Sequence, residues 1–308
     1  MDDQLVQEFV RCEAGKRRCF SYFKGRYALL LLKYALGDGC AIAELRKTPF
    51  QSLLKKPAVK PALQWAGDGR LTPDLLDFSW QEPALDFVVS FSQFSGWCQT
   101  SRTGANLVIQ LNFSKSAQRA YERALRPVEH AALQGWGHPV DRWSRETLAW
   151  VRVDLDLDDE EALIEEIQCD WLRVVDNLLV AHRNDPKDAA VWSQLRTTVG
   201  ALRRYHQALK PYRQIWAEAA LAAALDYLLG DLGIRRVFYH QFETGCRLKG
   251  IDWRDAPPRS LYTELPRRFC MQATDSGPQF LMRQRGIRRR LAGAEAPTFF
   301  QLTPSLSG

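Results

Sequence analysis

The chain of 308 residues lacks a long apolar run, and with it the signature of a membrane span. Its most apolar stretch, Tyr27–Leu36, is interrupted by Lys33 and is shorter than the roughly 18 apolar residues that a span requires. The first residues also lack the basic and apolar regions of a secretory signal. We therefore expect a cytoplasmic protein that makes no membrane contact.

Paired cysteines and the common catalytic motifs are also missing. The seven cysteines are odd in number and scattered, and no two form Cys-x-x-Cys. This spacing argues against a disulfide framework and against a zinc ribbon. The chain contains no Walker loop, Gly-x-Gly-x-x-Gly, nucleophile elbow or His-Glu-x-x-His, which argues against several large enzyme classes.

The hydrophobic pattern that is present predicts a mixture of helices and strands. Residues 2–37 carry apolar side chains at helical spacing, and so do residues 116–125, 169–181, 189–209 and 215–229. Apolar and polar residues alternate as in strands over 86–94, 106–113, 148–157 and 162–168. The tail beyond Gln241 is rich in loop-forming residues. We expect an α+β (or α/β) fold, helix-predominant, with a small mixed sheet built from hairpins.

A run of glycine, tryptophan and proline at 135–139 predicts a boundary between two regions. Residues 1–135 would form an N-terminal helical region plus a strand pair. Residues 140–308 would form an α/β region with an acidic hairpin and a basic C-terminal tail.

Charge is distributed unevenly behind the net value of +6. Residues 151–188 hold 12 acidic and 4 basic side chains, whereas residues 241–308 hold 11 basic and 6 acidic ones. A basic surface beside an acidic pocket suits a polyanionic partner such as nucleic acid. The alternative is that both are solvated faces that favour solubility.

The acidic segment Trp150–Trp171 carries the most information. Residues 151–157 alternate strictly, so Asp154 and Asp156 would share one face of a strand with Arg152. If residues 162–168 form a second strand, Glu165 and Glu166 face opposite sides. One of them then points toward the apolar side and needs a partner or a metal. As a helix, the same residues would place their carboxylates in solvent, and propensity alone leaves both readings open.

The segment Leu163-Ile164-Glu165-Glu166-Ile167-Gln168-Cys169-Asp170-Trp171 resembles one that recurs in the large polyvalent proteins of phages and conjugative elements. The resemblance covers about residues 148–245, including Trp216-Ala217-Glu218-Ala219-Ala220. Cys169 stands where that pattern has Ser, and Leu172 stands where His is frequent. The resemblance implies a second strand in this segment and a mobile-element or host-conflict setting.

Acidic side chains on neighbouring strands also resemble the hairpin of restriction-endonuclease-like nucleases, which carries Asp on one strand and Glu-x-Lys on the next. Clustered carboxylates bind Mg²⁺ or Mn²⁺, and the metal activates water and stabilises charge on phosphate. The metal ligands would be Asp154, Asp156 and Glu166, and the catalytic residues would be Glu166, Gln168 and Asp170. Gln168 departs from the nuclease pattern, because a neutral amide supplies no positive charge.

Arginines outside this segment are candidates for holding a phosphate. The candidates for substrate binding are Arg102, Arg259, Tyr262, Arg267 and Arg268. We carry two hypotheses. The first is a protein that acts on or binds a phosphate-bearing substrate, as a metal-dependent nuclease does. The second is a non-enzymatic interaction protein of a mobile-element or phage-conflict system, in which the acidic hairpin docks a basic partner.

Overall fold

The computed structural model describes residues 1–80, 83–95, 99–130, 132–134, 138–141, 145–184, 195–252, 254, 256–295 and 298–304. Within these residues, one mixed sheet has 8 strands in the order β1-β4-β5-β6-β7-β8-β10-β9. Its strands are β1 (Arg18–Tyr22), β4 (Leu85–Phe94), β5 (Asn106–Phe113), β6 (Thr147–Asp156), β7 (Glu161–Gln168), β8 (Arg236–His240), β9 (Gln272–Thr274) and β10 (Phe299–Leu302). A separate small pair consists of β2 (Cys40–Ala41) and β3 (Arg70–Leu71).

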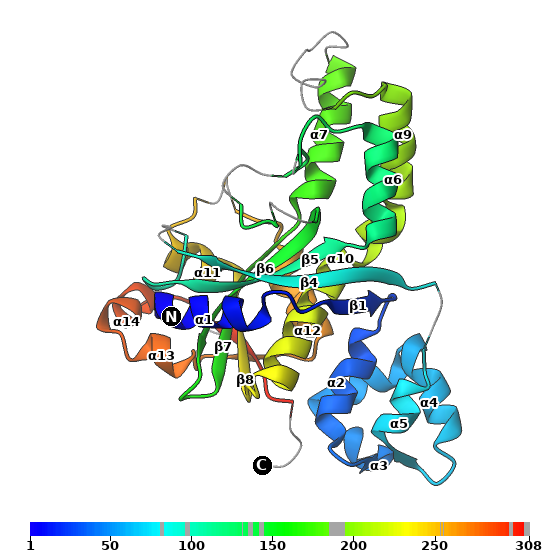
Figure 1. The fold of residues 1–308 in the computed structure, drawn as a ribbon. Coiled ribbons are helices and arrows are strands. Elements are labelled where there is room, and N and C mark those ends of the chain that lie inside the picture. The colour runs from blue at the N-terminus through cyan, green and yellow to red at the C-terminus, as the bar shows by residue number, and fades with distance from the viewer. Residues whose placement is uncertain are drawn as a thin grey trace.

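Some of the described helices pack against this sheet and others lie beyond it (Figure 1). They are α1 (Asp3–Glu13), α2 (Tyr27–Leu36), α3 (Ile42–Leu45), η1 (Pro49–Lys55), η2 (Pro57–Val59), α4 (Lys60–Trp65), α5 (Pro73–Asp77), α6 (Lys115–Leu125), α7 (Asp170–Asn184), α9 (Val199–Ala208), α10 (Lys210–Leu225), η3 (Asp226–Asp231), α11 (Phe242–Lys249), α12 (Ser260–Arg268), α13 (Gln279–Met282) and α14 (Arg285–Leu291).

One pair of neighbouring strands in the sheet is parallel. From β1 through β4, β5 and β6 to β7, each strand pairs antiparallel with the next, whereas β7 and β8 run parallel. A parallel pair needs a long crossover, which here passes through α7, α9 and α10. Strand β10 then returns antiparallel between β8 and β9.

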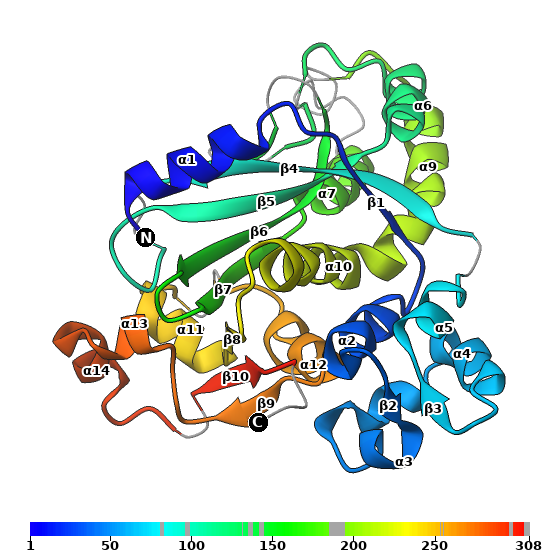
Figure 2. The same ribbon diagram turned by 60° about the horizontal axis from the view of Figure 1, so that its bottom comes forward.

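Each face of the sheet buries its own apolar cluster. Helix α10 packs across β5, β6 and β7 on one face (Figure 2), and its many alanines favour the helix and permit a close approach. That face carries Ile164 and Ile167. On the other face, Leu163 and Phe238 pack against residues of α11, α13 and α14. Helices α6, α7 and α9 stand together as an arm beyond the sheet (Figure 1).

The mixed class is confirmed, but the prediction of a small sheet is wrong. Strand β1 lies inside residues 2–37, which the helical spacing assigned to helix. Gly15 and Gly25, with φ of +81° and +88°, turn the chain on either side of it. Strands β9 and β10 lie in the tail, where the loop-forming residues hid two short strands.

The predicted boundary at 135–137 lies outside the described residues. Strand β5, before that boundary, pairs with β6 after it, and one apolar cluster contains residues from both sides. None of the described helices is long and apolar enough to cross a membrane.

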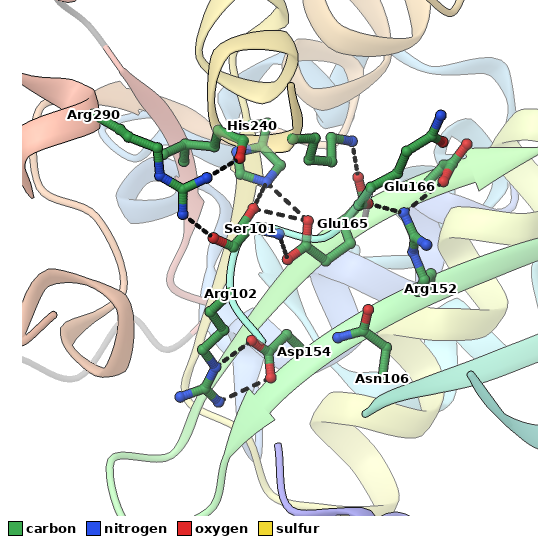
Figure 3. Close-up of polar contacts among 12 residues, drawn as sticks. Ser101, Arg102, Asn106, Arg152, Asp154, Glu165, Glu166, His240 and Arg290 are labelled. Atoms are coloured by element: carbon green, nitrogen blue, oxygen red, sulfur yellow. Dashed lines mark hydrogen bonds and ion pairs between the residues drawn. The ribbon is translucent and has the colours of Figure 1, made fainter. Parts of the chain in front are cut away.

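Residues 147–168 form a hairpin, and an irregularity in it decides where the two glutamates point. Arg152 pairs with Glu166 and Val153 pairs with Ile164, so Glu165 is an extra residue in β7. Such a bulge places two successive side chains opposite one residue of the partner strand. Glu165 and Glu166 therefore both lie on the face that carries Arg152 (Figure 3), and neither enters the apolar face under α10.

Candidate functional site at the carboxyl end of strand β7

A cavity of about 700 Å³ lies beside the last residues of β7. Strand β8 pairs with β7 only from Glu161 to Ile164, so among the described strands none covers this side of β7 from Glu165 to Gln168. The carboxyl ends of parallel strands are a common place for ligands. The cavity is lined by Gln99, His138, Glu166, Ile167, Gln168, Cys169, Leu172, Arg173, Asp176, Asn177, Arg213, Trp216, Ile251, Ala256, Pro257, Pro258 and Leu261.

The three predicted catalytic residues come together at this cavity. Glu166 and Gln168 line it directly, and the side chain of Gln168 donates to Asp170 Oδ1 at 2.7 Å. Asp170 is the first residue of α7 and is 1% exposed. Glu166 accepts from Arg152 at 2.8 Å. The sequence thus identified one end of a real cavity.

His138 also lines this cavity and is a candidate functional side chain that the sequence did not single out. Its Nδ1 forms a hydrogen bond with Asp170 Oδ2, and its ring packs edge-on against Trp150. Arg173 donates to the other oxygen of Asp170 at 2.5 Å. His138 lies in a glycine- and proline-rich stretch that looked like a linker, 32 residues before Asp170. Only the fold brings the two residues together.

The surroundings of Asp170 favour its ionised carboxylate. Burial alone would raise the pKa of Asp170, but the hydrogen bond with His138, the hydrogen bond from Gln168 and the charge of Arg173 hold that pKa below its usual value. An ionised carboxylate accepts only, so Nδ1 of His138 must carry the proton that it shares with Asp170. In the neutral ring, Nε2 is then left with a free lone pair. Among the described residues, none forms a hydrogen bond or ion pair with that nitrogen, and the side chain is 31% exposed.

A cysteine lines the same cavity but is not suited to act as a nucleophile. Burial raises the pKa of the Cys169 thiol to about 12. The reactive form of cysteine is the thiolate, which is scarce at neutral pH with such a pKa. The described lining residues include no serine or threonine. A hydroxyl nucleophile at this cavity would therefore come from the substrate or from water.

Next to the cavity, a buried polar cluster ties the loop at Ser101 to the sheet (Figure 3). Glu165 accepts from the backbone N–H of Ser101 at 3.1 Å and from its hydroxyl at 2.9 Å. His240 Nε2 lies 2.9 Å from the same hydroxyl and 3.2 Å from Glu165. A catalytic triad uses both ring nitrogens, one for the nucleophile and one for the acid. Here one nitrogen meets both partners and all three residues are fully buried, so the cluster is structural.

Each of the three residues predicted as metal ligands has partners within the molecule. Asp154 is fully buried, accepts two hydrogen bonds from Arg102 and one from the amino group of Met1, and lies opposite Leu163. Asp156 accepts from backbone N–H groups of the turn that follows it. Glu166 faces Arg152. Within the described part of the chain, no group of three ligand-type side chains converges. Asp154 and Asp156 do alternate along one strand, but cations of the protein itself already neutralise Asp154 and Glu166, and Asp156 is held by the backbone of its own turn.

The predicted substrate-binding residues are also dispersed. Arg102 is held by Asp154, and Arg259 pairs with Glu243 and lies over Phe242. Neither lines the cavity beside β7.

The remaining three belong to helix α12. Tyr262 is buried beneath the ammonium group of Lys249, and Arg267 lies over the ring of Phe300. Arg268 pairs with Glu218 and borders a smaller neighbouring hollow. The sequence suggested that these residues hold a phosphate together, but helix α12 turns their side chains in different directions.

No family model, no curated protein and no solved structure matches this chain.

Proposed function

We propose that the chain is an enzyme that acts by proton transfer on a substrate bound in the cavity beside β7. The observation that carries the proposal is the His138–Asp170 pair. A buried, ionised carboxylate orients the imidazole and fixes the proton on Nδ1, which leaves Nε2 as a base at the cavity. In the proposed step, Nε2 accepts a proton from water or from a nucleophile of the substrate, and the carboxylate stabilises the resulting imidazolium.

A phosphate-bearing substrate, which the sequence suggested, remains part of this proposal. Arg173 uses Nη2 for Asp170 and is 59% exposed, so its other N–H groups are accessible to an anion in the cavity. The cytoplasmic location also remains a proposal, and so does the mobile-element setting that the resemblance implies.

The alternative, a basic partner docked on the acidic hairpin, has less support. Most carboxylates of the hairpin are paired within the molecule, among them Asp154 with Arg102, Glu161 with Arg236 and Asp159 with Arg283. A basic partner would have to compete with each of these arginines.

The test uses bis(p-nitrophenyl) phosphate as a chromogenic probe. Loss of a general base lowers turnover by about 100-fold or more, and we expect this for His138→Gln. Asp170→Asn should also lower turnover and shift its pH profile, which a merely structural role would not do. The matched control is His130→Gln, because His130 is 30% exposed and lies outside the cavity. Turnover that persists in His138→Gln, or no turnover by the wild type, would overturn the proposal.

A further inference from the structure

A second cavity, of about 670 Å³, is lined by residues of helices α6 and α9. The two helices lie side by side in Figure 1. Four arginines line it, namely Arg123, Arg126, Arg196 and Arg204. Within the described ranges, no acidic side chain lines this cavity, and no ion pair involves any of the four. Four like charges around one hollow repel one another, so the arrangement favours an anionic ligand.

Backbone contacts hold two of these arginines on neighbouring segments. Arg126 follows the end of α6 with a φ of +48°, a position that usually takes glycine because other side chains are strained there. The N–H of Arg196 donates to the carbonyl of Arg126 at 3.0 Å, and Pro127 and Leu195 form an antiparallel bridge. The backbones of these two lining arginines are thereby held next to each other.

Arg204 and the start of α9 add donors to the same cavity. Nη1 of Arg204 lies 3.7 Å from the point where a Cβ on Gly200 would stand, so the side chain reaches back toward the first turn of its helix. Thr198 caps that turn through Ala201. The N–H groups of Val199 and Gly200 have no acceptor within the helix, and the helix dipole favours an anion there.

The floor of the cavity is apolar and aromatic. The rings of Phe113, Tyr205 and Tyr212 lie along it, and five alanines line the rest, namely Ala117, Ala120, Ala124, Ala201 and Ala208. Small side chains keep the space open. A volume of about 670 Å³ lies in the range of pockets that hold small organic ligands. The ligand therefore has a planar or apolar body as well as several negative charges.

We propose that this cavity binds a nucleotide, with its phosphates among Arg123, Arg126, Arg196 and Arg204 and its base on the aromatic floor. Guanidinium groups bind phosphate oxygens bidentately, and aromatic rings stack on bases. The inference does not rest on proton transfer at His138, because none of the four arginines lines the cavity beside β7.

The test measures binding of ATP to the full chain by titration calorimetry in EDTA at about 50 mM NaCl, where phosphate contacts are strongest. The double variant Arg196→Gln/Arg204→Gln should weaken binding by at least about tenfold, since each charged hydrogen bond is lost. The matched control is Arg119→Gln/Arg203→Gln, because both arginines are exposed on α6 and α9 but do not line the cavity. This control should bind ATP like the wild type.

Two further measurements separate a nucleotide from other anions. Ala201→Trp fills the floor, so it should weaken ATP binding while leaving inorganic tripolyphosphate binding within about twofold. Four outcomes overturn the proposal: no ATP binding, equal ATP binding by the wild type and the Arg196/Arg204 variant, tripolyphosphate binding as tight as ATP, or a single-stranded oligonucleotide that binds far more tightly than ATP. The last outcome would assign the cavity to a polynucleotide backbone.

Discussion

The cavity beside β7 and the cavity between α6 and α9 have nearly the same volume, about 700 and 670 Å³. They differ in whether their arginines have acidic partners. At the first, Glu166 pairs with Arg152, Arg173 pairs with Asp170, and Arg213 pairs with Asp176. At the second, four arginines stand without a described acidic partner. Removing one member of a buried pair leaves an uncompensated charge and costs stability, whereas removing an exposed unpaired charge costs mainly ligand affinity. The two regions should therefore respond differently to the same kind of substitution.

The largest loss of stability is expected from Glu165→Ala. Glu165 is fully buried and accepts hydrogen bonds from Ser101 and His240. Its removal leaves these donors unpaired and takes the counter-charge away from buried cations nearby, so we expect the free energy of unfolding to fall by about 3–5 kcal/mol. Urea denaturation measures it. Glu264→Ala is the control, because Glu264 is 66% exposed and its removal should change stability little.

Acid should act on the same cluster in a predictable direction. Burial alone would raise the pKa of Glu165, but the hydrogen bond and charge of His240 and the charge of Lys249 outweigh it and lower that pKa from 4.5. The unfolded chain therefore takes up this proton first, and stability present above about pH 4.5 is lost as the pH falls through the lower folded value.

His240 acts in the same direction, because burial lowers its pKa from 6.5 and the unfolded chain binds that proton first as the pH falls. Urea midpoints measured between about pH 7 and pH 3 should fall more steeply in the wild type than in Glu165→Gln. Parallel profiles would mean that Glu165 contributes nothing to acid sensitivity.

Regular alternation of apolar and polar residues was enough to predict the hairpin strands from the sequence. The pattern over residues 148–157 and 162–168 located both strands of the hairpin, and the polar cluster Glu166, Gln168 and Asp170 does meet at one cavity. Alternation could not predict the bulge at Glu165, because the register of two strands is a property of their pairing.

Other features were beyond the sequence because they depend on distant contacts. His138 reaches Asp170 across 32 residues, and Arg126 meets Arg196 only through a bridge between two loops. The amino-acid composition also does not show whether an arginine has an acidic partner. Arg102 and Arg259, which were expected to bind substrate, are ion-paired, whereas Arg123, which was not singled out, lines a cavity with no acidic side chain among its described lining residues.

A smaller loss of stability is expected from Tyr205→Phe, at the place where the second cavity meets the core. Trp171 donates its ring N–H to the hydroxyl of Tyr205 at 3.0 Å, and both side chains are buried. Tyr205→Phe leaves that N–H without its acceptor, which costs about 1–3 kcal/mol in the free energy of unfolding. The aromatic floor keeps its ring, so ATP affinity should stay within about twofold. Tyr212→Phe serves as the comparison, because no described hydrogen bond of its hydroxyl is lost. An equal loss of stability in both variants would contradict this role of Tyr205.

The smallest change in stability is expected from the arginines that matter most for the ligand. All four are exposed, and none pairs with a described acid. Arg196→Gln/Arg204→Gln should therefore change the free energy of unfolding by less than about 0.5 kcal/mol, and relief of mutual repulsion favours a small gain. Arg152→Gln, which strips a buried partner from Glu166, should cost several times more in the same urea measurement. If both variants lost stability to the same extent, the arginines at the second cavity would have structural partners and the contrast between the two regions would disappear. If only Arg196→Gln/Arg204→Gln keeps the stability of the wild type while its ATP affinity falls, the charge of these arginines serves binding alone.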